Sequence, residues 1–254
     1  MLHHAVGTMI AARRRHVAVR LTIAPQDILM LLMDAQDPET GHGLSDLEIR
    51  ANVIALMAAG HESTANAITW TLFLPSRSTE WHDRVLAEAS QQLDGPAETV
   101  SDRLIETRAV IDEALRLYPP LAAISRVALA DDELAERPIK RGAIIVFAPY
   151  VLHRHHALWR QADHFDPSRF LPKARKDIDR YAYLPFGTGP RGCIGSVFAM
   201  QEASLAVAAI IRSFELEMKP EHVVWPVHRI TLRPRGGLPM SIHERPLGRR
   251  SLAS

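Results

Sequence analysis

The chain begins with long stretches of helical apolar spacing and continues with short β-branched runs. The segment SDLE forms a capping box in which Ser45 and Glu48 can satisfy each other's backbone N–H groups. Nothing then interrupts a helix before Pro75, so the pattern predicts one helix over residues 45–74, a rod of about 45 Å. Because that helix is apolar on nearly every side apart from a thin polar stripe, we expect it to be buried.

Two more helices are predicted near residues 80–92 and 104–117, and Pro119 and Pro120 stop the second of them. Another apolar helix starts just after Cys193. Short strands are expected in four segments rich in β-branched residues: ISRVALAD, PIKRGAIIVFAPY, VHRITLRP and PMSIHE. No internal repeat or linker is visible. The order of patterns, helices first and short strands later, predicts an α+β fold that is predominantly helical.

The composition predicts a globular protein, with 47% hydrophobic and 23% charged residues. A formal net charge of +1 gives no reason to expect nucleic acid as a partner. The N-terminal apolar stretch precedes the arginines, the reverse of a secretory signal, and no stretch approaches the length of a membrane span. A single cysteine excludes an internal disulfide and suits a reducing compartment. We therefore expect a cytoplasmic location and no membrane span.

The only cysteine lies in FGTGPRGCIG, residues 186–195, together with four glycines. A lone cysteine is usually a small buried hydrophobe. Here the glycines free the backbone for positive φ or for close approach to a flat ligand. The start of the following helix also favours an anionic sulfur at Cys193. The sulfur is thus predicted to be a metal ligand or a nucleophile, and a nucleophile would need a base such as a histidine of HRHH, residues 153–156.

FGTGPRGCIG resembles the haem-binding loop of the cytochrome P450 family at every position of that loop's pattern. The resemblance implies that Cys193 is the axial ligand of a haem b iron, with Gly187 and Gly195 completing the loop. Phe186 would pack beside the thiolate, and Arg191 would meet a propionate. Thiolate ligation pushes electron density onto iron and favours O–O cleavage.

The predicted long helix contains a polar break in the segment MAAGHESTANAITW. Glycine inside a helix costs about 1 kcal/mol relative to alanine, so Gly60 requires a reason, which is either close helix packing or a groove for a small ligand. AAGHEST resembles the oxygen-binding segment of the same family. By that resemblance Glu62 feeds protons inward, Ser63 hydrogen-bonds bound O2, and Thr64 is a second hydroxyl that could assist. The family usually has threonine at the position of Ser63.

Glu113 and Arg116 in IDEALRLYPP lie three residues apart on a predicted helix. On its own this spacing describes a surface ion pair worth a few tenths of a kcal/mol. Together with the later segment FDPSRF it resembles the family's glutamate–arginine–arginine network, which Arg169 would complete. That network is structural and ties the helix to the meander before the haem loop.

Two basic features resemble the family more weakly. Arg126 in ISRVA resembles a propionate-binding arginine, although an ordinary surface arginine explains it equally well. LPKARKDIDR precedes the haem loop, near the face where the family docks its electron donor, and a solvated loop is the alternative explanation.

The motifs occur in the family's order, so the resemblance implies a single partial cytochrome P450 domain over residues 1–254. Its N-terminal half would be missing, and the fold would be a truncated cytochrome P450 fold. The expected parts are the oxygen-binding helix 45–74, the glutamate–arginine helix 104–117, the strands and meander 124–185, the haem-thiolate loop and closing helix 186–213, and the C-terminal strands 214–243.

The implied function is haem-thiolate monooxygenation, in which one oxygen atom from O2 enters a lipophilic small molecule. Electrons would come from a ferredoxin-like or flavoprotein partner. An alternative is a truncated, non-catalytic fragment that binds haem weakly or not at all, because an open haem pocket would lose its enclosure. A cysteine hydrolase is a third reading, which no spacing between nucleophile and base recommends.

Overall fold

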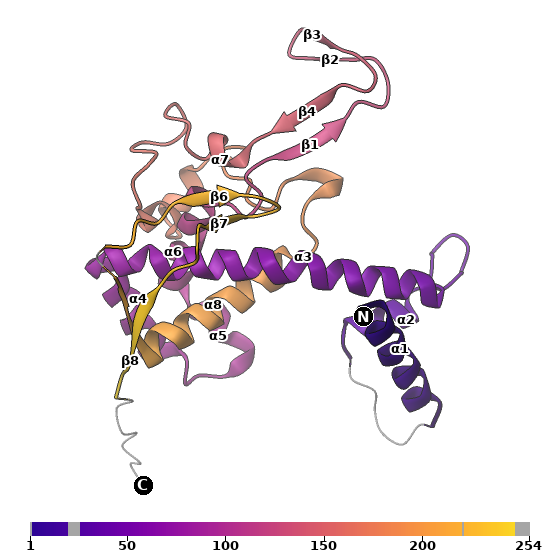
Figure 1. Cartoon of the computed structure of the whole chain (residues 1–254), viewed down its shortest axis with the longest axis horizontal. Helices are drawn as coiled ribbons and strands as arrows, with labels where there is room; N and C mark the ends of the chain where they lie inside the picture. The colour runs from indigo at the N-terminus through magenta and orange to yellow at the C-terminus, as the bar shows by residue number, and fades with distance from the viewer. Residues whose placement is uncertain (1, 20–25, 220, 247–254) are drawn as a thin grey trace. The chain divides into compact units, whose positions relative to one another are not determined.

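The computed structural model describes residues 2–19, 26–219 and 221–246. The chain divides into two compact units, Met1–Glu62 and Ser63–Ser254. The boundary falls inside one helix, α3 (Asp46–Phe73), which closely matches the helix predicted over residues 45–74 (Figure 1).

The first unit consists of α1 (Leu2–Val19), α2 (Ile28–Asp34) and the N-terminal part of α3. The predicted capping box forms, because the Ser45 N–H donates to Glu48 Oε2 at 2.8 Å. The unit's core is one stripe of apolar side chains from the three helices: Val6, Ile10, Leu29, Ile49 and Val53.

The prediction that the long helix is buried is wrong for the part of α3 in the first unit. Leu47 is 70% exposed and Met57 is 50% exposed. The reason is that the core of this unit takes the stripe of α3 that carries Ile49 and Val53, with Ile54 packed against it, while Leu47, Leu56 and Met57 are exposed.

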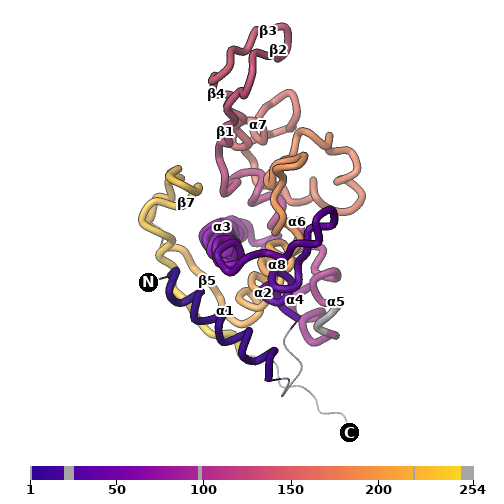
Figure 2. Tube along the Cα trace, turned by 90° about the vertical axis from the view of Figure 1, so that its right-hand side faces the viewer, coloured from indigo at the N-terminus to yellow at the C-terminus, as the bar shows by residue number. Residues whose placement is uncertain are grey.

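The second unit is built around helix α6 (Ile105–Leu117), ten of whose thirteen residues are buried. The C-terminal part of α3, α4 (Thr79–Gln92) and α8 (Ser196–Ser213) pack against it, as Figure 2 shows for α3 and α8. α5 (Ala97–Arg103), which the sequence pattern did not predict, packs on α8. The helices of this unit therefore pack together through apolar side chains that recur at helical spacing.

Among the described residues, the strands form four separate antiparallel pairs, and each of the four predicted strand segments contains at least one strand. The predicted segment PIKRGAIIVFAPY divides into β3, β4 and the short helix α7 (Pro149–Leu152). β2 and β5 lie outside these four segments, although β5 opens the C-terminal strands expected over residues 214–243. The pairs are β1 (Ile124–Val127) with β4 (Ile144–Phe147), β2 (Asp132–Leu134) with β3 (Arg137–Ile139), β5 (Phe214–Met218) with β8 (Met240–Glu244), and β6 (Pro226–His228) with β7 (Leu232–Pro234).

The C-terminal strands are fastened to the helices through Trp70. Its indole N–H donates to the carbonyl of Leu232 at 3.1 Å, and its ring stacks on Tyr118 at 3.8 Å. Four single-turn 3-10 helices complete the described chain: η1 (Pro75–Arg77), η2 (Pro167–Phe170), η3 (Ala174–Asp177) and η4 (Gly189–Arg191). The predicted α+β fold dominated by helices is confirmed.

Candidate functional site

The cysteine loop closes on itself through backbone hydrogen bonds. The Cys193 N–H donates to the carbonyl of Phe186 at 2.9 Å. Gly187 and Gly189 both have φ of +70°, a conformation that glycine adopts without the strain a side chain would add. α8 begins at Ser196, after the N-cap residue Gly195, so the sulfur precedes the helix directly.

The surface around the sulfur is open and apolar. Cys193 is a free, exposed thiol. Ile194 is 91% exposed and Phe198 is 65% exposed. A Cβ placed at Gly187 or Gly195 would meet no atom within 4 Å. A flat hydrophobic group can therefore approach the sulfur without displacing a side chain at these positions.

Phe186 joins the cysteine loop to the helices. It packs against a buried cluster that includes Ala67 of α3 and Met200 of α8. Ser63 lies four residues before Ala67, hence on the same face of α3. Ser63 is half-buried, and Thr64 is 8% exposed. The second unit thus brings the face of α3 that carries Ser63 toward the helices next to the cysteine loop.

Gly60 and Glu62 belong to the first unit, where α3 is helical without interruption through the polar break. Gly60 is exposed, and a Cβ there would meet no atom within 4 Å. No close helix contact among the described residues therefore explains this glycine. Glu62 is half-buried.

Glu113 and Arg116 form a fully buried ion pair, both side chains being 0% exposed. Arg116 Nε donates to Glu113 Oε2 at 2.6 Å, and Nη2 donates to Oε1 at 2.8 Å. Arg169 Nε lies 3.7 Å from Glu113 Oε1, so the three side chains meet. Burial raises the pKa of the Glu113 carboxyl, and the hydrogen bonds from Arg116 oppose this rise. The surface-pair interpretation of this motif is wrong.

Arg116 also fixes the chain that leads toward the cysteine loop. Its guanidinium donates to the carbonyls of His153 at 2.8 Å, Ala162 at 2.6 Å and His164 at 3.0 Å. Glu113 Oε1 in turn accepts the N–H of Asp166 at 2.8 Å. These hydrogen bonds replace those that Arg116 and Glu113 would make with water, and they offset the cost of burying the two charges.

Two residues near the loop make contacts that the sequence did not predict: His153, which HRHH offered only as a candidate base, and Asp112. His153 is fully buried, and its Nε2 accepts the N–H of Leu184 at 2.9 Å, so this nitrogen is not available as a base for the thiol. Asp112 accepts the hydroxyl of Tyr183 at 3.0 Å and pairs with Arg175. The sequence does not indicate which histidine of HRHH is buried, or that Asp112, directly before Glu113, would contact Tyr183 and Arg175.

The two arginines proposed to meet propionates are both exposed. Arg191 ends the 3-10 helix η4 inside the cysteine loop. Arg126 lies on β1 opposite Ile145, and its Nη1 donates to the carbonyl of Ser125 at 2.9 Å.

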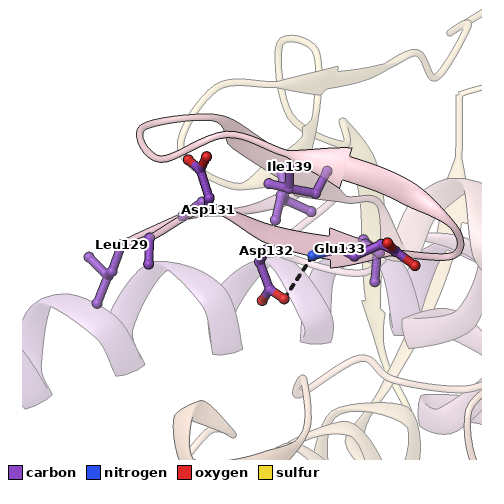
Figure 3. A pocket seen from close by; sticks show the side chains of 9 residues that line it. Leu129, Asp131, Asp132, Glu133 and Ile139 are labelled. Atoms are coloured by element: carbon purple, nitrogen blue, oxygen red, sulfur yellow. Dashed lines mark hydrogen bonds between the residues drawn. The ribbon is translucent and has the colours of Figure 1, made fainter.

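Two of the cavities that the described residues form are open to solvent. Figure 3 shows one of about 320 Å³ at the β2–β3 hairpin, lined in part by Leu129, Asp131 and Ile139 and by none of the candidate site residues. The other, of about 270 Å³, is lined by residues of α6 and α8 and by residues 183–187, which enter the cysteine loop. The second cavity therefore adjoins the candidate site.

In the part of the chain that the structure describes, no helix is both long and apolar enough to cross a membrane. The same residues hold no cluster of three or more metal-ligating side chains.

A helical fold that presents an exposed thiol between open glycines fits the class of haem-thiolate proteins. The sequence model of the family described as Cytochrome P450 matches residues 2–238. The chain therefore belongs to the cytochrome P450 family, and this membership implies a haem cofactor.

Relatives and solved structures agree with this assignment. The chain is 42% identical to "Cyclooctatin synthase" of Streptomyces melanosporofaciens over 81% of this chain and 45% of the relative. It is 37% identical to "Pentalenene oxygenase" of Streptomyces avermitilis over 91% of this chain and 51% of the relative. The crystal structure of the cytochrome P450DA heme domain superposes with a TM-score of 0.87 and 32% identity, over 96% of this chain and 53% of that one. The chain thus spans about half the length of the proteins it matches.

The described residues fit a haem. Its iron needs an axial ligand, which the exposed sulfur of Cys193 can supply. Its apolar ring needs a surface that excludes water, which Ile194 and Phe198 offer beside open glycines. Its propionates need cations, and Arg191 lies in the same loop.

Proposed function

We propose that this chain carries the haem-thiolate site of a monooxygenase that inserts one oxygen atom from O2 into a lipophilic small molecule. The observation that carries the proposal is the exposed Cys193 in a glycine loop closed by the Cys193–Phe186 backbone bond. When bound, haem b supplies the O2 chemistry, which an axial thiolate favours. Two relatives are named "Pentalenene oxygenase" and "Cyclooctat-9-en-7-ol 5-monooxygenase", and both names agree with an apolar substrate.

The loop residues each have a defined task in this proposal. Cys193 provides the axial thiolate, while Phe186 packs beside it from the cluster shared with Met200. Gly187 and Gly195 let the ring lie close to the backbone, because no side chain occupies that space. Arg191 neutralises one propionate. Arg126 is a further candidate for the same task, since its exposed guanidinium is free to turn from its own backbone to an anion.

The polar segment of α3 handles protons in this proposal. Glu62 is the proton donor, and the Ser63 hydroxyl holds a proton for delivery to the substrate site, with Thr64 as a nearby second hydroxyl. Serine lacks the methyl group that restricts the rotamer of threonine, so its hydroxyl is held less firmly. Electrons come from a ferredoxin-like or flavoprotein donor, and the exposed basic side chains of residues 173–180 offer a surface for it.

Ser63→Ala tests this assignment. Removing the hydroxyl should uncouple electron consumption from product formation, because no hydroxyl at this position would then hold the proton for transfer. Ser63→Thr keeps a hydroxyl and restricts its rotamer, so it should keep or improve coupling. The measurement is product formed per reduced donor consumed. Equal coupling in all three proteins would contradict the role of Ser63.

The haem assignment is tested with the full chain mixed with haem, reduced and exposed to carbon monoxide. Thiolate ligation predicts a red-shifted Soret band. Cys193→Ser should abolish that band, whereas Cys193→His should give the band of a nitrogen-ligated haem. A band that is the same in the wild type and in Cys193→Ser would overturn Cys193 as the ligand.

A second candidate is a non-catalytic fragment that binds haem weakly or not at all. The specific observation that favours it is the exposure of apolar side chains beside the sulfur, with Ile194 91% and Val197 80% exposed. A site that leaves so much apolar surface in water holds a hydrophobic ligand less firmly than an enclosed one. A colourless product after mixing with haem would support this candidate.

A further inference from the structure

Residues 183–186, here called the stem, lead into the cysteine loop along the open cavity of about 270 Å³. Tyr183, Leu184, Pro185 and Phe186 all line that cavity. Tyr183 and Phe186 also pack against buried apolar clusters, and the ring centre of Tyr183 lies 4.7 Å from that of Phe170. The backbone of Leu184, between these two side chains, is held by a hydrogen bond to the rest of the unit.

His153 makes one of those bonds from a fully buried position. Its Nε2 accepts the N–H of Leu184 at 2.9 Å, and its ring centre lies 5.4 Å from that of Tyr183. Its own carbonyl accepts Arg116 Nη1 at 2.8 Å. One residue thus contacts the buried ion pair through its backbone and the stem through its side chain.

The chain of contacts continues to the sulfur-bearing residue. Leu184 lies two residues before Phe186, whose carbonyl accepts the N–H of Cys193 at 2.9 Å. If the N–H of Leu184 lost its acceptor, this partly buried donor would be left without a bond, at a cost that favours a shifted stem. A shifted stem would move the carbonyl that closes the loop.

We propose that His153 is a positioning residue for Cys193, acting as a neutral imidazole whose Nε2 holds the stem against the Glu113–Arg116 pair. Only an unprotonated Nε2 can accept a hydrogen bond, so the ring proton resides on Nδ1. The inference rests on the proposed function only in treating the position of Cys193 as functionally important. The anchoring itself belongs to the polypeptide and does not require haem.

If His153 only filled space as a buried aromatic ring, its variants would behave differently. Phenylalanine would replace such a ring well, whereas glutamine would not. If the acceptor is what matters, the order reverses, because the Gln side-chain oxygen can take the place of Nε2 while phenylalanine offers no acceptor. His153→Phe and His153→Gln therefore form a matched pair.

The test is amide hydrogen exchange at Leu184 and Cys193 in the full chain, with Val207 of α8 as the internal reference for global opening. His153→Phe should speed exchange at Leu184 by about 10- to 100-fold relative to Val207, as expected for a lost buried hydrogen bond, and should also speed Cys193. His153→Gln should stay within about threefold of the wild type. Tyr183→Phe removes only the two hydrogen bonds from the Tyr183 hydroxyl to Asp112 and should leave exchange at Leu184 unchanged relative to Val207.

Equal exchange at Leu184 in His153→Phe and His153→Gln would overturn the proposal. If His153→Phe does not fold, His153→Asn replaces it, because its shorter amide reaches the position of Nδ1 and not that of Nε2. Fast exchange at Leu184 in His153→Asn would then support the anchoring, and wild-type exchange would refute it. A chain that shows the expected exchange but binds no haem would refute the proposed function and leave the anchoring intact.

Discussion

The Glu113–Arg116 pair and the cysteine loop lie in the same unit and have opposite surroundings. Both side chains of the pair are 0% exposed, and the guanidinium of Arg116 donates five hydrogen bonds. Cys193 is exposed, and beside it Ile194 is 91% exposed. The pair is satisfied entirely within the polypeptide, whereas the loop presents sulfur and apolar surface to whatever binds there.

This difference shows that the contacts supporting the loop lie within the polypeptide, while the surface around the sulfur is left exposed. A buried pair has to be complete, because each unpaired charge would carry the full cost of desolvation. A ligand surface has to stay open, and the glycines keep it open at little cost. Substitutions in the pair should therefore affect stability strongly, and substitutions at the sulfur should affect ligand binding.

The largest effect is expected for Glu113→Ala. Removing the carboxylate leaves the buried guanidinium of Arg116 without its partner, so the free energy of unfolding should fall by about 3–5 kcal/mol. Denaturant unfolding measures this change. Asp131→Ala, which breaks the exposed pair with Lys140, is the control and should leave the unfolding midpoint unchanged. Similar unfolding midpoints for Glu113→Ala and Asp131→Ala would contradict the claim that the buried pair contributes more to stability than an exposed one.

The next largest effect is the dependence of the free energy of unfolding on pH, through the titration of His153. Burial lowers the pKa of His153 to about 4 from its usual 6.5. Between these pH values the unfolded chain binds more protons than the folded one, so the free energy of unfolding should fall by about 3 kcal/mol as the pH drops from 6.5 to 4. The contribution is fully present above pH 6.5.

Denaturant unfolding at several pH values measures that dependence, and His153→Gln, which cannot titrate, is the comparison. The charged and titratable groups around the ring are Arg116 on α6, Arg154 next in the chain and Tyr183 of the stem, and they are the same in both proteins. An identical pH dependence in the variant would show that His153 does not titrate as described.

A smaller effect on stability is expected from alanine substitutions of two glycines in the cysteine loop. Comparing them distinguishes the cost of backbone strain from the cost of placing a methyl group in the open space. A Cβ at Gly187 or at Gly195 meets no atom within 4 Å, but only Gly187 has a positive φ, +70°. Gly187→Ala should therefore lower the free energy of unfolding by about 1 kcal/mol, and Gly195→Ala should leave it nearly unchanged. Thermal unfolding of the haem-free chain compares them. Haem affinity should fall in both variants, because each methyl group enters the open face.

The smallest effect on stability is expected for Cys193→Ser. The side chain is exposed, so the free energy of unfolding should change by no more than about 0.5 kcal/mol. The carbon monoxide spectrum should nevertheless lose its thiolate band. A large loss of stability in the haem-free variant would mean that the cysteine supports the fold as well as the ligand.

The sequence was most informative where one local rule decides the structure. The capping box at Ser45 and the unbroken run to Pro75 gave the bounds of α3 to within a residue. The glycine spacing of residues 186–195 indicated the loop that α8 follows. The four strand segments chosen from the sequence omit β2 and β5, because DEL and FELEM lack a clear β-branched pattern; only the broader range 214–243 included β5.

The sequence was least informative where contact between distant segments decides. The apolar faces of α3 predicted burial throughout, and the structure leaves Leu47 and Met57 exposed. Spacing alone described Glu113 and Arg116 as a surface pair, and only the resemblance to a family suggested a network. Nothing in HRHH distinguishes His153, which is buried, from His155 and His156, which are exposed.

The sequence by itself determined the bounds of the long helix and the position of the one cysteine in a glycine loop. The helix bounds follow from capping and chain breakers, which act within a few residues of each other, whereas the expected role of the cysteine came from the resemblance to a family. The tertiary structure alone decided that Arg116 is buried against three carbonyls and that His153 accepts the N–H of Leu184. Such contacts join residues 31 to 48 positions apart, and burial of a polar group depends on which distant partners the fold supplies.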